Sequence, residues 1–180
     1  IFRAGASLKL FQETYLRASY GQGYRFPTIT ERFIRTGIGD LGMFPNPGLM
    51  PETSWNAEIG LKQGFKFWEF MGYLDVAGFM QQYENTIEYL FGFWENLAVA
   101  QSTPAGFRFV NTGDSRVVGI DMSFTGLAKL GKNGQLMVMA GYNYIVPVSL
   151  NPDYIYATDS IGQDLSYNNT SIDPSNRILK

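Results

Sequence analysis

The feature that most constrains this chain is an alternation of apolar and polar residues with a period of two, which recurs in six segments. A period of two is the repeat of a β-strand, because successive side chains of a strand point to opposite faces. The pattern therefore predicts an all-β fold built from an antiparallel sheet. The six segments expected to be strands are 2–10, 16–25, 54–62, 74–81, 118–125 and 136–144.

The fourth segment continues past Gln82 with its pattern out of phase. Tyr83, Ile87 and Tyr89 are the apolar members of the alternation beyond this point, which reverses the faces of the preceding residues. An extra residue in one strand produces such a shift, and so does a strand that leaves the membrane. We expect one of these two features near Gln82.

The connections between the segments alternate between short and long. Short turns followed by long loops are typical of a transmembrane barrel, with periplasmic turns at one rim and extracellular loops at the other. Compact soluble domains favour connections of about 4–6 residues. The short connections are 12–13, 66–69 and 131–134, and the long ones are 26–53, 91–105 and 147–180.

Alternation alone does not say whether the apolar face meets a protein core or lipid. Apolar stripes of four or five residues per face match barrel strands of ~9–11 residues. Aromatic residues at strand ends match the belts at membrane interfaces; they are Phe65, Phe67, Trp68 and Phe70 at one rim and Tyr20, Tyr24, Tyr142 and Tyr144 nearer the other. The polar face mixes glycines with charges, as expected for a lumen packed against a polar domain; these charges are Arg3, Lys9, Arg17, Glu58, Lys62, Asp75 and Asp121. We therefore favour a membrane barrel.

The composition excludes several other classes of protein. The chain has no Cys and no His, so a disulfide framework, a Ser-His-Asp triad and the usual zinc sites are not expected. The formal net charge of −2 gives no basic face for nucleic acid. No run of 18 apolar residues is present, so no transmembrane helix is predicted. We expect no enzymatic activity, no cofactor, no metal and no nucleic-acid partner.

Two motifs in the loop at 26–53 and its flanks carry a specific resemblance. Residues 21–33 read Gly-Gln-Gly-Tyr-Arg-Phe-Pro-Thr-Ile-Thr-Glu-Arg-Phe, and residues 46–52 read Asn-Pro-Gly-Leu-Met-Pro-Glu. In this order they resemble the β-barrel of TonB-dependent receptors, and 116–121 is similar to a strand of that family. We interpret the motif residues as structural anchors, with Arg25 and Glu31 able to pair at the loop base. The anchors are Arg25, Pro27, Glu31, Asn46, Pro47, Leu49, Pro51 and Glu52.

The resemblance implies a role in active transport. The parent would be a barrel of about 22 strands whose lumen holds a plug domain, and residues 1–180 would be an internal part of that barrel, without the plug and the remaining strands. It would sit in the outer-membrane lipid of a Gram-negative bacterium. Loops and plug would bind a scarce nutrient (a siderophore, haem, cobalamin or glycan), TonB–ExbB–ExbD would supply energy through the plug, and a surface lipoprotein lid is a possible partner.

Two alternatives remain open at the level of sequence. A passive porin-like channel would share the alternation but lack a plug, and a soluble surface-binding β-domain would fold without detergent. For a receptor, the expected ligand contacts are exposed aromatic side chains in the loops. Such side chains can bind a ligand, or they can pack the loops against one another. These candidates are Phe93, Trp94, Tyr154 and Tyr156.

Overall fold

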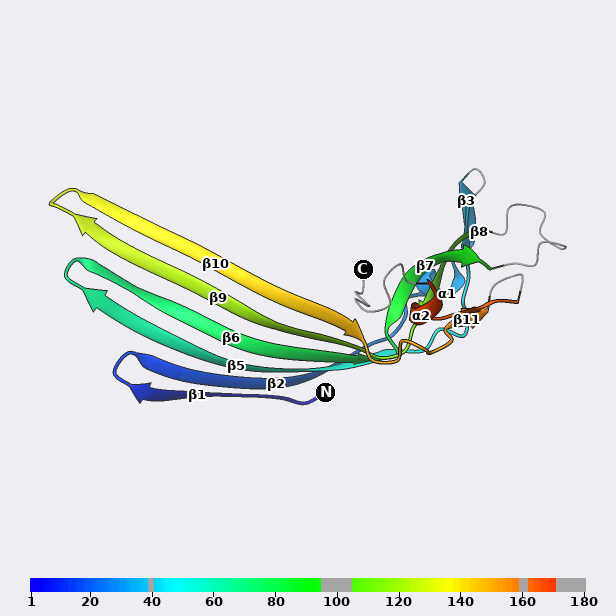
Figure 1. The fold of residues 1–180 in the computed structure, drawn as a ribbon, viewed down its shortest axis with the longest axis horizontal. Coiled ribbons are helices and arrows are strands. Elements are labelled where there is room, and N and C mark those ends of the chain that lie inside the picture. Colours follow the sequence, from blue (N-terminus) through cyan, green and yellow to red (C-terminus); the bar gives the residue numbers. More distant parts are fainter. Residues whose placement is uncertain (39–40, 95–104, 159–161, 171–180) are drawn as a thin grey trace. The chain divides into compact units, whose positions relative to one another are not determined.

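The largest element of the fold is an antiparallel sheet of six strands, in the order β1-β2-β5-β6-β9-β10 (Figure 1). A computed structural model describes residues 1–38, 41–94, 105–158 and 162–170. Each of the six predicted segments corresponds to one strand of this sheet, so the predicted antiparallel all-β fold is confirmed. The strands are β1 (Arg3–Phe11), β2 (Thr14–Arg25), β5 (Glu52–Phe67), β6 (Phe70–Glu84), β9 (Ser115–Leu130) and β10 (Gly134–Ser149).

Several strands are longer than the alternation predicted. β5, β9 and β10 have 16 residues each and β6 has 15. A strand needs only ~9–11 residues to cross a bilayer. The backbone ladder therefore continues beyond places where a residue breaks the alternation, such as Gln63 among the apolar positions of β5.

The three predicted short connections are tight turns. They lie at 12–13, 68–69 and 131–133, at the same end of the strands (Figure 1). Gly131 has φ 67 and Trp68 has φ 50. Glycine adopts this left-handed backbone conformation without steric cost. The same conformation is uncommon for a bulky residue such as Trp68.

The chain divides into two compact units. The first, residues 1–22, 55–81 and 117–146, holds most of the six-stranded sheet. The second comprises residues 23–54, 82–116 and 147–180, which correspond mainly to the predicted long connections. No described helix has the length and hydropathy needed to cross a bilayer.

The long connections contain secondary structure that the sequence analysis did not predict. Their principal feature is a four-stranded sheet in the order β3-β4-β8-β7, in which β4 and β8 are parallel. Residues 95–104, 159–161 and 171–180 of the predicted connections lie outside the described residues. The elements are α1 (Ile29–Phe33), β3 (Thr36–Ile38), β4 (Leu41–Phe44), β7 (Ile87–Phe93), β8 (Ala105–Asn111), β11 (Ala157–Thr158), β12 (Asp164–Leu165) and α2 (Tyr167–Thr170).

The shift of phase after Gln82 marks the end of a strand. β6 stops at Glu84, Asn85 takes a left-handed backbone with φ 55, and β7 begins at Ile87 as part of the four-stranded sheet. The chain therefore leaves the six-stranded sheet at this point. Asn85 tolerates the left-handed conformation better than most non-glycine residues.

Candidate functional site

The apolar face of the six-stranded sheet is exposed. Ile59 on β5 is 60% exposed, Ile120 on β9 is 47% exposed and Leu8 on β1 is 59% exposed. A soluble sheet covers such a row of branched side chains with a second layer, because contiguous apolar surface in water is unfavourable. A face of this kind requires an apolar environment outside the chain.

Aromatic rings gather beside the turn at 68–69. The ring of Phe65 stacks on that of Phe70 at 5.7 Å between centroids and on that of Phe124 at 5.6 Å. Phe67 lies 6.2 Å from Phe65, and Trp68 in the turn is 96% exposed. This is the rim where the sequence predicted an aromatic belt, and bulky rings at a strand end suit the interface between hydrocarbon and water.

A charge cluster lies on the opposite, polar face of the sheet. Arg17 on β2 donates to Glu58 on β5 at 3.1 Å and to Asp75 on β6 at 2.5 Å. Gly60 leaves room for the guanidinium, since a Cβ there would lie 2.8 Å from Arg17 Nε. The side chains on this face thus join three neighbouring strands through ionic contacts, as a polar lumen wall allows.

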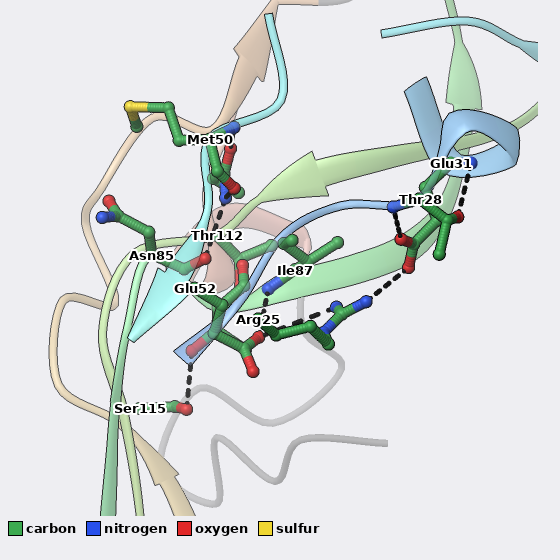
Figure 2. A network of polar contacts seen from close by, with 11 residues as sticks. Arg25, Thr28, Glu31, Met50, Glu52, Asn85, Ile87, Thr112 and Ser115 are labelled. Carbon is green, nitrogen blue, oxygen red and sulfur yellow. Dashed lines mark hydrogen bonds and ion pairs between the residues drawn. The ribbon is translucent and has the colours of Figure 1, made fainter. Parts of the chain in front are cut away.

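The second unit contains a polar network at the base of the predicted long loop, shown in Figure 2. Arg25 at the end of β2 pairs with Glu31 of α1 at 2.7 Å, which confirms the predicted pair. Arg25 also lies 3.9 Å from Glu52 at the start of β5, and Glu52 accepts the backbone N–H of Ile87 at 3.0 Å. The network therefore ties the two ends of the loop to each other and to β7.

A capping box begins α1 and fixes Glu31. The Thr28 side chain accepts the Glu31 backbone N–H, and the Glu31 carboxylate accepts the Thr28 backbone N–H at 2.6 Å. Partial burial raises the pKa of Glu31, but the hydrogen bonds from Thr28 and Arg25 outweigh burial and hold that pKa below its ordinary value. Glu31 therefore stays ionised in this network.

The Asn-Pro-Gly-Leu-Met-Pro-Glu motif is fastened to its surroundings through its backbone and Asn46. The Asn46 amide donates to the carbonyl of Phe109 on β8 at 2.8 Å, and Leu49 is buried with 4% of its surface exposed. Arg32 of α1 donates to the Pro47 carbonyl at 3.1 Å. The segment therefore links α1 to β8.

The prolines of the two motifs restrict the backbone where the chain enters α1 and β5. Pro27 and Pro51 are half-buried and precede α1 and β5 respectively. Neither has a backbone N–H, so each stiffens the chain without leaving a donor to satisfy. Between them, Met50 exchanges two hydrogen bonds with the Asn111 side chain, at 2.9 and 3.2 Å.

The four aromatic ligand candidates lie in two separate settings. Phe93 ends β7 and is 43% exposed, and Trp94 next to it donates its indole N–H to the Gly106 carbonyl at 3.0 Å. Tyr154 is also 43% exposed, whereas Tyr156 packs its ring against Tyr167 of α2 at 6.1 Å. Trp94 and Tyr156 thus have contacts within the second unit, and Phe93 and Tyr154 present exposed rings.

Three polar residues of the loop region have structural roles that the sequence did not predict. Arg32 and Asn111 hold the second motif as described above, and Arg108 lies on β8 beside Trp94. A single Arg inside the glycine- and aromatic-rich segment 106–109 was the available signal for Arg108. Asn111 contacts Met50, which lies about 60 residues away in the sequence, and no local pattern encodes such a contact.

An antiparallel sheet with an exposed apolar face, an aromatic rim and a charged opposite face defines a segment of a membrane barrel wall. The comparison with family models agrees: residues 1–177 match the family described as TonB dependent receptor-like, beta-barrel. The chain belongs to this family. No curated protein sequence matches the chain.

Membership defines the general class of the protein. Proteins of this family are outer-membrane transport receptors for small molecules, and they are transporters and not enzymes. The typical location of the family is the outer membrane of Gram-negative bacteria. The exposed apolar face of the six-stranded sheet is the face suited to contact with lipid in a barrel of this kind.

Proposed function

We propose that this chain forms part of the barrel wall of a receptor that imports one scarce nutrient with energy supplied through TonB, ExbB and ExbD. The observation that carries the proposal is the family match over residues 1–177, joined to a sheet whose two faces have opposite character. Ile59 and Ile120 project from the apolar face, whereas Arg17 and its carboxylate partners occupy the other.

The charged face supports a plugged lumen. A cluster such as Arg17, Glu58 and Asp75 is stable where polar groups or water lie opposite it, and a plug domain supplies such groups. A barrel of about 22 strands has room for this plug. Residues 1–180 would then be a partial barrel whose outer strands pair with strands elsewhere in the protein.

The loop residues divide into two roles under this proposal. The motif residues from Arg25 to Glu52 act as structural anchors, since their contacts are with backbone groups and with one another. Ligand contacts come from the aromatic residues Phe93, Trp94, Tyr154 and Tyr156. The ligand is a siderophore, haem, cobalamin or a glycan, and a surface lipoprotein that closes over it is an optional partner.

Uptake by the full-length receptor tests this function. The receptor is produced in a Gram-negative host with or without TonB, and import of a labelled ferric siderophore, haem, cobalamin and an oligosaccharide is measured. We expect one of these to enter only when TonB is present, and a protonophore to abolish its entry. Entry that persists without TonB would instead indicate a passive channel, and recovery of the protein without detergent would indicate a soluble β-domain.

A further inference from the structure

β7 is an edge strand of the four-stranded sheet in the second unit. Its pairing with β8 runs in one unbroken register from Ile87, opposite Asn111, to Phe93, opposite Ala105. The other edge strand of this sheet, β3, has only three residues, whereas β7 has seven. β7 is therefore the longer of the two edges at which a further strand can be added.

The direction of the backbone groups alternates along β7, as it does in any antiparallel pair. The Thr86 carbonyl accepts the N–H of Thr112 at 2.9 Å, so the even-numbered residues face β8. The Ile87 N–H instead donates to the Glu52 carboxylate at 3.0 Å, on the side away from β8. The N–H and C=O groups of three further residues point to that same side, and we call this row the free edge: Tyr89, Phe91 and Phe93.

The free edge has no backbone partner among the described residues. The backbone hydrogen bonds of the described loops and turns do not involve its three residues, and β8 is the neighbour of β7 in the sheet order. Natural sheets protect long edges with lysine, proline, bulges or very short strands. β7 contains no lysine, proline or bulge. Because backbone donors and acceptors are normally paired or solvated, such an edge is suited to pair with another strand.

Exposed aromatic rings line one face of the free edge. Tyr89, Phe91 and Phe93 are 41%, 53% and 43% exposed, and their side chains share one face because they alternate along the strand. The rings of Phe107 and Phe109 on β8 lie 4.8 and 4.7 Å from the ring of Tyr89 between centroids. A strand added at the free edge would place its own alternate side chains beside these rings, where aromatic and β-branched side chains pack well.

We propose that the free edge of β7 binds an extended segment of another polypeptide, which joins the four-stranded sheet as a fifth, antiparallel strand. A row of N–H and C=O groups on alternate residues matches the backbone of an extended peptide, and the neighbouring rings select apolar side chains at alternate positions. The Glu52 carboxylate occupies the N–H of Ile87, so the added strand ends near Tyr89. This partner is additional to the nutrient of the proposed function, and its binding does not depend on TonB.

A synthetic peptide with the sequence of β8, Ala105–Asn111, is a suitable probe because β8 already pairs with the other side of β7. The peptide is capped at both ends and labelled with a fluorophore, and its binding to the full-length receptor in detergent is measured by fluorescence anisotropy. In an added antiparallel strand, the peptide's two Phe residues lie opposite Tyr89 and Phe91 on the ring face, so their N–H groups point at β7. The N–H groups of its Arg and Val residues point away from β7.

Two N-methylated peptides with equal numbers of methyl groups provide the matched controls. Methylation of the two Phe residues should weaken binding at least about tenfold, because two backbone hydrogen bonds to β7 are lost. Methylation of the Arg and Val residues should change the affinity less than about threefold. Absence of binding by the unmethylated peptide, or equal weakening by the two methylation patterns, would overturn the proposal. Loss of binding on Arg and Val methylation alone would also overturn it, since a peptide that displaces β8 bonds to β7 through those residues.

Two receptor variants test the same edge from the side of β7. Phe91→Pro removes the middle N–H of the free edge and leaves the bonds to β8, and proline is tolerated on an edge strand where its N–H side faces outward. Phe91→Ala also removes the ring but retains the N–H. The unmethylated peptide should bind Phe91→Pro at least about fivefold more weakly than Phe91→Ala. Equal binding by the two variants would overturn the proposal, and the methylated peptides still decide the question on the unaltered receptor if Phe91→Pro does not fold.

Sedimentation of the receptor without peptide tests a second copy of the receptor as the occupant of the free edge. We expect the same oligomeric state for the wild type and both variants. A dimer that Phe91→Pro separates into monomers, and Phe91→Ala does not, would assign the free edge to a second copy and overturn the proposal.

Discussion

Ile59 allows the lipid-facing assignment to be tested by a single substitution. It lies near the middle of β5 and is 60% exposed on the apolar face. Arginine on the lipid face of a barrel costs about 2–4 kcal/mol at the bilayer midplane. At about 1.4 kcal/mol per factor of ten, Ile59→Arg should therefore raise the unfolding equilibrium constant roughly 30- to 700-fold.

The assay is denaturant unfolding of the full-length receptor refolded into phosphatidylcholine vesicles. Ile59→Leu keeps an apolar side chain and should change the unfolding free energy little. Phe67→Arg places the same charge on the same face beside a turn, where the cost falls to about 0–1 kcal/mol. Phe67 is 70% exposed, so no buried packing obscures the comparison.

The result that refutes the reasoning is a small effect. A water-exposed site tolerates substitution within about 0.5 kcal/mol. If Ile59→Arg changed the free energy of unfolding by no more than this, or no more than Phe67→Arg, the face would not lie in hydrocarbon. The assignment of β5 to the lipid-facing wall of the barrel would then be wrong.

Three further predictions concern the loop anchors and the glycines. The folded pKa of Glu31 is lowered, so its contribution to loop stability is complete above its ordinary pKa and is lost as pH falls through the folded pKa; Glu31→Gln should remove this part of the pH dependence of hydrogen exchange at Arg25. Gly106→Ala would place a Cβ 2.0 Å from a backbone oxygen, whereas Gly78 has nothing within 4 Å of its Cβ position; we expect a loss of about 1–3 kcal/mol for the first in thermal unfolding and none for Gly78→Ala. Asn46→Ala removes a 2.8 Å hydrogen bond and should cost about 1 kcal/mol, visible as faster amide exchange in β8.

Much of the six-stranded sheet could be predicted because its signal is local. The alternation in 118–125 marks the middle of β9 without reference to any other part of the chain. The turns at 12–13 and 68–69 follow from the places where the alternation stops. The end of β5 was missed because Gln63 stands at an apolar position and breaks the pattern before Phe65 and Phe67 resume it.

The loop region could not be predicted in the same way. β4 is four residues long and pairs in parallel with β8, which begins about 60 residues later. Such pairing depends on contacts between distant segments, and a short strand carries little periodicity. The close approach of Gly42 and Gly106 is visible only once the two strands are side by side.

The candidate site was predicted in part. Arg25 and Glu31 were expected to pair at the loop base because they stand in the same short motif, which is again a local relationship. Arg108 was not predicted because its neighbours in the fold, Phe44, Leu90 and Trp94, come from other segments of the chain. Among them its buried Nε has no hydrogen-bond partner. No residue close to Arg108 in the sequence indicates that its Nε lacks a hydrogen-bond partner.

The most direct test of the central claim is the environment of alternate residues along β9 in the full-length receptor. Because residues 1–180 contain no Cys, single cysteines can be introduced at positions 118–125 and spin-labelled without removing a native thiol from this part; any cysteine elsewhere in the receptor is first replaced. Electron paramagnetic resonance in lipid vesicles then compares collisions with oxygen, which concentrates in hydrocarbon, and with a water-soluble nickel complex. We predict strong oxygen contact at Val118, Ile120 and Met122 and weak contact at Gly119 and Asp121. Accessibility that does not alternate, or oxygen contact highest at Asp121, would contradict the account.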